Sequence, residues 1–397
     1  MHWPLSSYSE NFIDDSCCPN MRFGLEVDRR DWCLGMFSKR RHVDSGLGVT
    51  ILRITLGFVA VLALSGCDDR SMTSQEIDQS AIEEANERSA GSVLRLTPEF
   101  DELVSADAVI EELATGFGFT EGPHWIEYHG LYGGAVLFSD IPGNQILLWS
   151  SDHSMSSFLT PVFEGETDGG FVGSNGITTD AEGRVVFTEH GNRRISRIEP
   201  DGSRVVVVDS YQGKRLNSPN DLVFHSNGSL YFTDPPYGLA QQDDDPSKEL
   251  EVNGIYRLAT DGRLDLLATQ TRPNGLAFSP DESKLYVANS DATSRQWMVY
   301  DVEDDGMLGE VHVFADVTNE PGQGSPDGLK VDVMGNLWGT GPGGVWVFSP
   351  NGEHLGTIQP PERPANLTFG GGDGRTLFMT AQTGFYRVRV QVSGAVR

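Results

Sequence analysis

The sequence predicts an all-β protein that folds as a six-bladed β-propeller. One pattern, a polar residue followed by two alternating apolar runs with a turn between them, recurs six times along the chain. The copies follow one another at intervals of about 40 to 55 residues, which is the length of a propeller blade. The apolar residues alternate with a period of two, which is typical of strands and excludes helical repeats. The 46 glycines and 20 prolines among 397 residues supply the turns that such a fold needs.

Each repeat starts with a polar side chain at its first apolar run, which we call the anchor residue. The six anchor residues are Glu121, Asn175, Asn220, Asn274, Asp327 and Asn366. Turns rich in Gly, Asn and Asp separate the two runs of a repeat, and further strand pairs follow, which gives four strands per blade. We expect a strand near residues 109–113 to complete the last blade and close the ring.

The anchor residues predict a central metal site. The innermost strand of every blade starts at the central channel, so residues at equivalent repeat positions converge there. Two carboxylates and four carboxamides around one axis form a costly cluster unless a cation organises them. All six offer oxygen, which indicates a hard cation, and Ca²⁺ is favoured because it accepts six to eight oxygens in irregular geometry. Mg²⁺, Mn²⁺ and Zn²⁺ are the alternatives, and a second interpretation is that Asn and Asp recur only as turn formers, which Glu121 fits poorly.

Residues 1–66 are predicted to be an N-terminal extension and a lipoprotein-type signal peptide that is removed. Basic residues at 39–41 and 53 precede the apolar run 56–64, and small residues then lead to Cys67. This order resembles the lipobox of bacterial lipoproteins, in which the cysteine is lipidated. We therefore expect a periplasmic or cell-surface lipoprotein of the bacterial cell envelope, attached to the membrane only through Cys67. Residues 67–95 are predicted to be an acidic polar tether, and residues 96–397 the propeller.

Charge and cysteine content exclude several classes of function. Residues 1–66 hold equal numbers of acidic and basic side chains, so the rest of the chain carries the net charge of −28, which argues against a nucleic-acid partner. No apolar run reaches the roughly 20 residues of a membrane-spanning helix. The predicted exported domain has no cysteine beyond Cys67, and no Gly-x-Ser-x-Gly or His-Glu-x-x-His motif occurs in the chain. The sequence specifies no oligomeric state.

Seven short motifs occur in a fixed order between residues 98 and 390. They are Phe119-Thr-Glu-Gly-Pro123, Leu137-Phe-Ser-Asp-Ile141, Glu189-His-Gly-Asn-Arg193, Asn217-Ser-Pro-Asn-Asp221, Tyr231-Phe-Thr-Asp-Pro-Pro-Tyr-Gly238, Arg272-Pro-Asn-Gly275 and Ser325-Pro-Asp-Gly328. In this order and spacing they resemble the gluconolactonase and senescence-marker-protein (regucalcin) family of six-bladed propellers, and in particular its bacterial gluconolactonase branch.

The resemblance implies a metal-dependent hydrolase that opens sugar lactones. It implies that Glu121, Asn274 and Asp327 bind one divalent cation, and that Asn220 binds the metal or the substrate. The cation acts as a Lewis acid on the lactone carbonyl, and Asp327 is the predicted general base that activates water. The alternatives are a non-catalytic propeller that serves as a binding platform in the cell envelope, and a related hydrolase for non-sugar lactones or phosphotriesters.

Other side chains are predicted to contact the substrate. Asn175, His190, Asn220 and Tyr237 are the candidates, whereas His124 is interpreted as structural. Residues 238–253 form an insertion that lies over the channel mouth or is a surface loop.

The chain departs from the family at one substrate position. Some animal members carry an arginine two residues before the third-blade asparagine, where this chain has Ser218. Asn217, Arg215 and Arg272 are the candidate replacements.

Overall fold

The computed structural model describes residues 88–127, 134–152, 154–165 and 171–395. They all belong to one compact unit. The predicted signal peptide, Cys67 and the tether up to residue 87 lie outside the described residues. No helix within the described part of the chain is long and apolar enough to cross a membrane.

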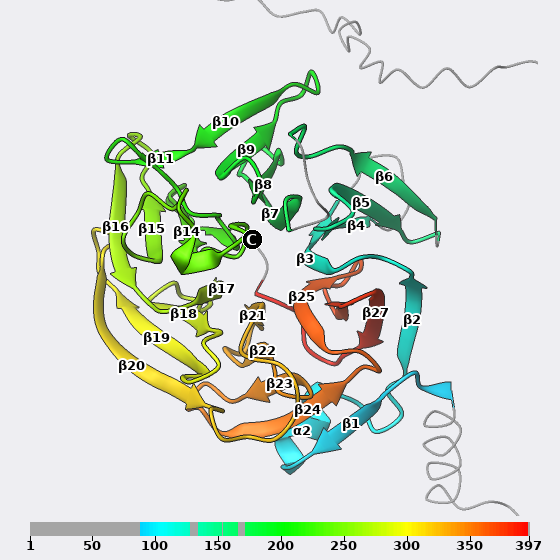
Figure 1. The fold of residues 1–397 in the computed structure, drawn as a ribbon. Coiled ribbons are helices and arrows are strands. Elements are labelled where there is room, and N and C mark those ends of the chain that lie inside the picture. Colours follow the sequence, from blue (N-terminus) through cyan, green and yellow to red (C-terminus); the bar gives the residue numbers. More distant parts are fainter. Residues whose placement is uncertain (1–87, 128–133, 153, 166–170, 396–397) are drawn as a thin grey trace, which may run out of the picture. The chain divides into compact units, whose positions relative to one another are not determined.

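Six antiparallel sheets are arranged as blades around a central axis (Figure 1). The first three blades are built from strands in chain order. Blade 1 contains β3 (Thr120–Ile126), β4 (Ala135–Asp140), β5 (Gln145–Ser150) and β6 (Met155–Leu159). Blade 2 contains β7 (Ser174–Thr179), β8 (Val185–Glu189), β9 (Arg194–Ile198) and β10 (Arg204–Val208). Blade 3 contains β13 (Leu222–Phe224), β14 (Leu230–Asp234), β15 (Gly254–Leu258) and β16 (Leu264–Thr269), preceded by the hairpin of β11 (Ser210–Tyr211) and β12 (Lys214–Arg215).

The other three blades complete the ring. Blade 4 contains β17 (Pro273–Phe278), β18 (Lys284–Asn289), β19 (Gln296–Val302) and β20 (Leu308–Asp316). Blade 5 contains β21 (Leu329–Val331), β22 (Leu337–Gly341), β23 (Gly344–Phe348) and β24 (His354–Gln359). Blade 6 contains β25 (Pro364–Gly370), β26 (Thr376–Ala381) and β27 (Gly384–Arg389). The six innermost strands, β3, β7, β13, β17, β21 and β25, each contact the innermost strand of the next blade.

An N-terminal strand closes the ring, as the sequence predicts. β2 (Ile110–Thr115) pairs antiparallel with β27, with Ile110 opposite Val388 and Thr115 opposite Gly384. The last blade therefore has four strands, and its outer strand comes from the opposite end of the propeller sequence. Such a closure leaves no long unpaired edge between the first and last blades.

Blade 5 has a fifth strand that the sequence assigns to the tether. β1 (Ser92–Arg95) pairs with β24, from Ser92 opposite Gln359 to Arg95 opposite Gly356. The short helix α2 (Pro98–Leu103) follows and buries Phe100 and Leu103 against blades 5 and 6. The ordered propeller thus begins before residue 96, because backbone pairing and two buried side chains hold this segment on the sheet.

The core consists of the apolar layers between neighbouring blades. Alternate side chains of each strand face the adjacent sheet, so the period-two pattern becomes a set of interleaved layers. Between blades 6 and 1, Phe138 stacks on Phe385 with the ring centroids 4.7 Å apart, and such pairs add about 0.5–1.5 kcal/mol to the area that they bury.

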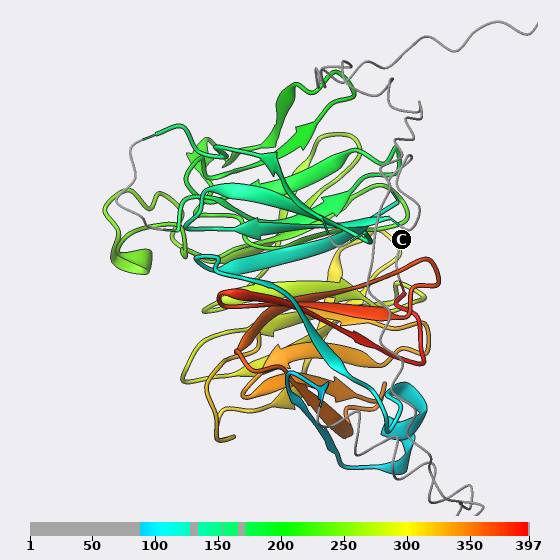
Figure 2. The same cartoon turned by 90° about the vertical axis from the view of Figure 1, so that its right-hand side faces the viewer.

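The two faces of the ring differ in their loops. Figure 2 shows the insertion 238–253, with the short 3₁₀ helix η1 (Gln242–Asp244), on one face and the C-terminal end on the opposite face. Gln242 of the insertion and five of the anchor residues line one cavity. The anchor residues therefore lie on the same face of the ring as the insertion.

Candidate active site

A cavity of about 400 Å³ lies where the innermost strands begin. One part of its wall is apolar, and the rest is formed by carboxylate, amide, hydroxyl and guanidinium groups. Its lining residues are Phe119, Glu121, Ile141, Phe171, Asn175, His190, Asn220, Tyr237, Gln242, Asn274, Ser290, Gly324, Ser325, Asp327, Arg363 and Pro364. The fold thus brings together every predicted metal ligand and substrate-binding residue of the described chain.

A break in strand register accompanies four of the six anchor residues. β3 shifts register between Glu121 and His124, and β7 does so between Ser174 and Ile177. Equivalent shifts occur in β17 and β25. An irregularity of this kind re-aims a side chain out of the strict alternation of the sheet. It lets the anchor side chains face the channel while the residues after them join the apolar layers.

The glycine after an anchor residue makes room for the next blade. A Cβ on Gly122, whose φ is +55°, would lie 1.9 Å from the carbonyl oxygen of Asn175. At Gly328 a Cβ would lie 2.0 Å from Cγ of Asn366. The glycines that follow Glu121 and Asp327 therefore set how closely the anchor residues of neighbouring blades approach.

Hydroxyl groups on the second strands of blades 1, 2 and 3 hold the anchor backbone of the next blade. Ser139 on β4 donates to the carbonyl oxygen of Asn175 at 2.7 Å, and Thr188 on β8 donates to that of Asn220 at 2.9 Å. Thr233 on β14 repeats the contact with Asn274 at 2.8 Å. These hydrogen bonds link the blades directly beneath the cavity and fix the positions of the anchor residues.

Burial makes the two anchor carboxylates difficult to ionise. The pKa of Glu121 is raised to about 7, chiefly by burial and also by the charge of Asp221, while hydrogen bonds from Asn366 and Gly122 act in the opposite direction. Burial also raises the pKa of Asp327 well above its ordinary value, with the charge of Glu121 as the next cause. Three mutually repelling carboxylates at one end of a channel require a compensating positive charge.

Several buried oxygens at this site have no hydrogen-bond donor. They are Oδ1 of Asn175, Oδ1 of Asn274, Oδ1 of Asp327 and Oδ2 of Asp221, each without a partner among the described residues. Buried acceptors are normally paired, so such a group of free oxygens indicates a ligand that the polypeptide does not supply. The donor set, which consists of carboxylate and amide oxygens, fits a hard divalent cation.

The anchor residues differ in what they do at the cavity. Asn366 does not line it, and its Nδ2 donates to Oε2 of Glu121 at 2.9 Å. The backbone N–H of Gly122 donates to the same oxygen at 2.7 Å. Asn366 therefore orients Glu121, while the other five anchor residues face the cavity themselves.

His190 and Tyr237 lie on the cavity wall. Burial lowers the pKa of His190 to about 4, so the ring is neutral near pH 7, and its Nε2 lies 3.4 Å from Nδ2 of Asn175. Burial, followed by the charge of Asp327, raises the pKa of the Tyr237 hydroxyl. Both side chains therefore offer uncharged polar groups to a ligand.

The insertion forms part of the cavity wall through Gln242. An ion pair joins Asp243 to Arg272, and Nδ2 of Asn253 donates to Oδ1 of Asp243 at 3.0 Å. A groove of about 640 Å³ beside the cavity shares Tyr237, Gln242 and Ser290 with it. The insertion is thus attached to the body of the propeller at the mouth of the cavity.

The candidate replacements for the family arginine all have other partners. Ser218 is fully buried and donates to the carbonyl oxygen of Pro235 at 2.6 Å. Asn217 is buried against Asp234 and Asn253. Arg215 is exposed and donates to the carbonyl oxygen of Asn192 at 3.2 Å, and Arg272 is held by Asp243. None of the three candidates lines the cavity.

Sequence reasoning missed Asp221 and Arg363. Asp221 directly follows the anchor residue Asn220, and a carboxylate beside an anchor was the available signal. Arg363 lies in the turn before β25, where no repeat position marks it, so only the folded chain shows that it reaches the cavity.

The opposite end of the channel has different chemistry. A cavity of about 100 Å³ there is lined mostly by apolar side chains together with His124 and Lys330. Nε2 of His124 lies 3.1 Å from Oγ1 of Thr179, and burial lowers the pKa of His124 to about 4. His124 faces away from the anchor cavity, in keeping with a structural interpretation.

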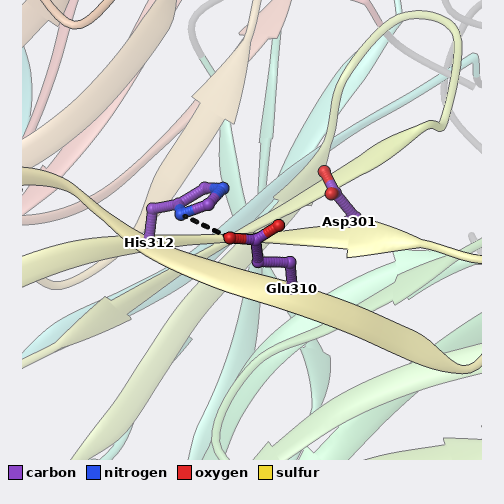
Figure 3. A group of neighbouring side chains, drawn as sticks. All are labelled: Asp301, Glu310 and His312. Carbon is purple, nitrogen blue, oxygen red and sulfur yellow. Dashed lines mark ion pairs between the residues drawn. The ribbon is translucent and has the colours of Figure 1, made fainter.

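A second group of possible metal ligands lies on the outer strands of blade 4. Asp301, Glu310 and His312 place one ligand atom each within 4.8 Å of one another (Figure 3). Glu310 and His312 are exposed, and Asp301 accepts a hydrogen bond from Lys284 at 2.8 Å. Figure 3 also shows the ion pair between Nδ1 of His312 and Oε1 of Glu310, which are 3.8 Å apart. These three side chains therefore have partners within the protein, unlike the buried oxygens of the channel.

A protein-family model described as SMP-30/Gluconolactonase/LRE-like region matches residues 119–383. This range includes every residue that lines the anchor cavity. The chain belongs to this family. A gluconolactonase of Zymomonas mobilis is 40% identical over 327 residues, which are 80% of this chain and 91% of that protein. An L-arabinolactonase of Azospirillum brasilense is 31% identical over 186 residues, 46% of this chain and 57% of that protein.

Solved structures of the family share the propeller. A gluconolactonase from Xanthomonas campestris is 34% identical, with a TM-score of 0.67 over 76% of this chain and 96% of that one. A calcium-binding regucalcin from Agrobacterium tumefaciens is 18% identical, with a TM-score of 0.57 over 71% of this chain and 94% of that one, and shows the common fold.

Proposed function

We propose that this family member hydrolyses sugar lactones in the anchor cavity with one bound divalent cation. The observation that carries the proposal is the group of buried oxygens without donors, on Asn175, Asn274 and Asp327, inside a cavity of about 400 Å³. The 40% identity with a gluconolactonase over most of both chains supports the substrate class.

Glu121, Asn220, Asn274 and Asp327 would hold the cation, and Ca²⁺ fits this all-oxygen set best. When bound, the cation supplies Lewis-acid polarisation of an ester carbonyl. Its charge would oppose the burial and the mutual repulsion that raise the pKa values of Glu121 and Asp327.

Asp327 is the proposed general base. Its carboxylate faces the cavity, so one oxygen can take a proton from the attacking water while the other holds the cation. The water oxygen adds to the lactone carbonyl, the bond to the ring oxygen breaks, and the proton held on Asp327 passes to that ring oxygen. The product is an open-chain hydroxy acid, which releases the second proton of the water to solvent and becomes a carboxylate.

The remaining cavity groups bind and orient the sugar ring. Phe119 and Phe171 pack edge to face with centroids 5.5 Å apart and give an apolar wall. Asn175, His190 and Tyr237 present neutral polar groups that can hydrogen-bond to sugar hydroxyls. This combination of one apolar wall and several polar groups suits a small polyhydroxy ring.

A substrate panel tests the proposal. The purified protein, loaded with Ca²⁺, is assayed by proton release with aldonolactones, with simple non-sugar lactones and with a phosphotriester. We expect the highest kcat/KM for an aldonolactone. Faster turnover of the phosphotriester or of a non-sugar lactone would reassign the substrate class, and binding without turnover of any compound would favour a binding platform.

We also propose that the protein is a cell-envelope lipoprotein acylated on Cys67. The basic residues, apolar run and small residues before Cys67 support this location. Expression with a labelled fatty acid tests it, with Cys67→Ser as the control. We expect label on the wild-type chain alone, and a wild-type chain without label would contradict the assignment.

A further inference from the structure

Arg363 contributes the single cationic side chain among the described residues that line the cavity. It lies in the turn between β24 and β25 and is half-buried. Its stem passes Gly324, where a Cβ would lie 3.2 Å from Cδ of Arg363 and where φ is +116°. A glycine at 324 thus leaves the space through which this arginine reaches the cavity.

The other arginines around the cavity face are engaged with the protein. Arg272 pairs with Asp243, and Arg193 donates to the carbonyl oxygens of Leu216 and Ser247 at 2.7 and 2.8 Å. Arg295 donates to the carbonyl oxygens of Gly324, Thr318 and Glu320. Arg363, in contrast, has no hydrogen bond and no ion pair with any residue that the structure describes, so its donors are available to a ligand.

Arg363 lies close to the reacting end of the cavity. It lines the same cavity as Asp327, and its stem packs at Gly324, three residues before Asp327 in the chain, yet no ion pair within 4.0 Å joins these two described side chains. A guanidinium near the general base, but not bound to it, is close to the carbon that becomes the carboxylate of the product. The planar fork of donors on arginine matches the two oxygens of a carboxylate.

We propose that Arg363 binds the acyl end of the lactone and, after ring opening, the carboxylate of the aldonate product. This assignment rests on the proposed lactonase function and adds a binding residue to it. It places the substrate-binding arginine of this chain on the turn before blade 6, in place of the position before the third-blade anchor, where Ser218 is buried and hydrogen-bonded to Pro235. Arg363 is a binding residue, and the proton transfers stay with Asp327.

The test compares Arg363→Gln and Arg363→Lys with the wild-type protein, all loaded with Ca²⁺. The measurements are kcat and KM for D-glucono-1,5-lactone, the inhibition constant of D-gluconate, and the Kd for Ca²⁺ from calorimetry. In Arg363→Gln, we expect KM and the gluconate inhibition constant to rise by about 10- to 100-fold, the usual effect of losing charge-assisted hydrogen bonds. Arg363→Lys keeps the charge without the fork, so intermediate values are expected, and the Kd for Ca²⁺ should not change.

Arg215→Gln is the matched control, because Arg215 is exposed and lies outside the cavity. It should keep wild-type constants. A gluconate inhibition constant in Arg363→Gln equal to that of the wild type would overturn the proposal. A rise that occurs only together with weaker Ca²⁺ binding would also overturn it, because Arg363 would then act on the metal site.

The proposed function and the role of Arg363 can fail separately. A wild-type protein that hydrolyses no lactone contradicts the function, whereas calorimetric binding of D-gluconate to the wild type and to Arg363→Gln still tests the arginine. Thermal unfolding identifies a variant that does not fold. If Arg363→Gln is such a variant, Arg363→Lys gives the result, and wild-type gluconate binding in Arg363→Lys would then count against the proposed bidentate contact.

Discussion

Two aspartates at opposite ends of β21 show how the same side chain serves fold and function differently. Asp332, just after the strand, is fully buried and accepts four hydrogen bonds, from the backbone of Met334 and Asn336 and from the side chains of Asn336 and Trp338. Asp327, just before the strand, has an Oδ1 with no donor in the described structure and faces a cavity. The polypeptide satisfies the carboxylate that holds the blade together and leaves the other available to bind and to react.

The same contrast separates the two ends of the channel. At the anchor end, free carboxylate and amide oxygens surround about 400 Å³ of space. At the other end, apolar side chains with His124 and Lys330 surround about 100 Å³. The buried oxygens without hydrogen-bond donors therefore mark the anchor end as the functional end of the channel.

The largest expected effect comes from Asp327→Asn. This change keeps the size and one ligand oxygen but removes the proton acceptor, so kcat for lactone hydrolysis should fall by about 10²–10⁴-fold. The assay is run at saturating Ca²⁺ with metal occupancy measured separately. Asn274→Ala is the comparison, since it removes a ligand without removing the base, and excess Ca²⁺ should partly restore its activity. Near wild-type turnover in fully metal-bound Asp327→Asn would exclude Asp327 as the base.

Asp332→Ala should have the opposite effect to Asp327→Asn, because it should lower the stability of the protein and leave catalysis intact. It leaves buried donors on Asn336 and Trp338 without an acceptor, which should lower the free energy of unfolding by about 3 kcal/mol. Urea unfolding gives the stability, and kcat measured at a temperature where the variant is folded should stay close to the wild-type value. A stable variant with reduced kcat would contradict the division of roles at the two ends of β21.

Asn366→Ala tests whether an anchor residue outside the cavity supports the metal site. Its Nδ2 donates to Glu121, so its removal should weaken Ca²⁺ binding by about 10-fold or more, as the loss of a residue that orients a ligand does. Calorimetry measures the Kd, and Asn227→Ala, in an exposed turn, is the control. Unchanged Ca²⁺ affinity would mean that Glu121 does not depend on Asn366.

The smallest effect is expected at the apolar end of the channel. The pKa of His124 is lowered to about 4, so the unfolded chain binds a proton at this histidine near pH 6 and the folded chain does not. Stability should therefore fall as the pH decreases from about 6.5 towards 4, by at most about 1.4 kcal/mol per pH unit for this one group. His124→Gln should reduce that slope in urea unfolding and leave kcat at pH 7 unchanged. An identical slope in the variant would show that His124 is protonated in the folded chain.

The repeat pattern was enough to predict the blades and the closing strand. Alternation reports directly which side chains enter the layers between sheets, and six copies at blade length leave one arrangement. The same repeat positions identified the anchor residues, because equivalent positions in a closed ring must converge. The family motifs identified the activity.

Other features depend on contacts that no local pattern records. β1 joins blade 5 because the exposed edge of β24 lies beside it, and its four residues carry no distinctive signal. Arg363 enters the cavity because Gly324, in a different loop, leaves space for it. Asn366 has the same repeat position as Asn274, yet it turns to Glu121, because the carboxylate of the first blade lies next to the last blade in the closed ring.

Calcium dependence of hydrolysis by the wild-type protein tests the central claim most directly. The protein is treated exhaustively with chelator, its metal content is measured, and hydrolysis of D-glucono-1,5-lactone is followed before and after Ca²⁺ is returned. We predict one Ca²⁺ per chain, loss of hydrolysis on its removal, and recovery in proportion to the Ca²⁺ that rebinds. Full lactone hydrolysis by protein shown to be free of metal would contradict the assignment of the unpaired anchor oxygens to a catalytic cation.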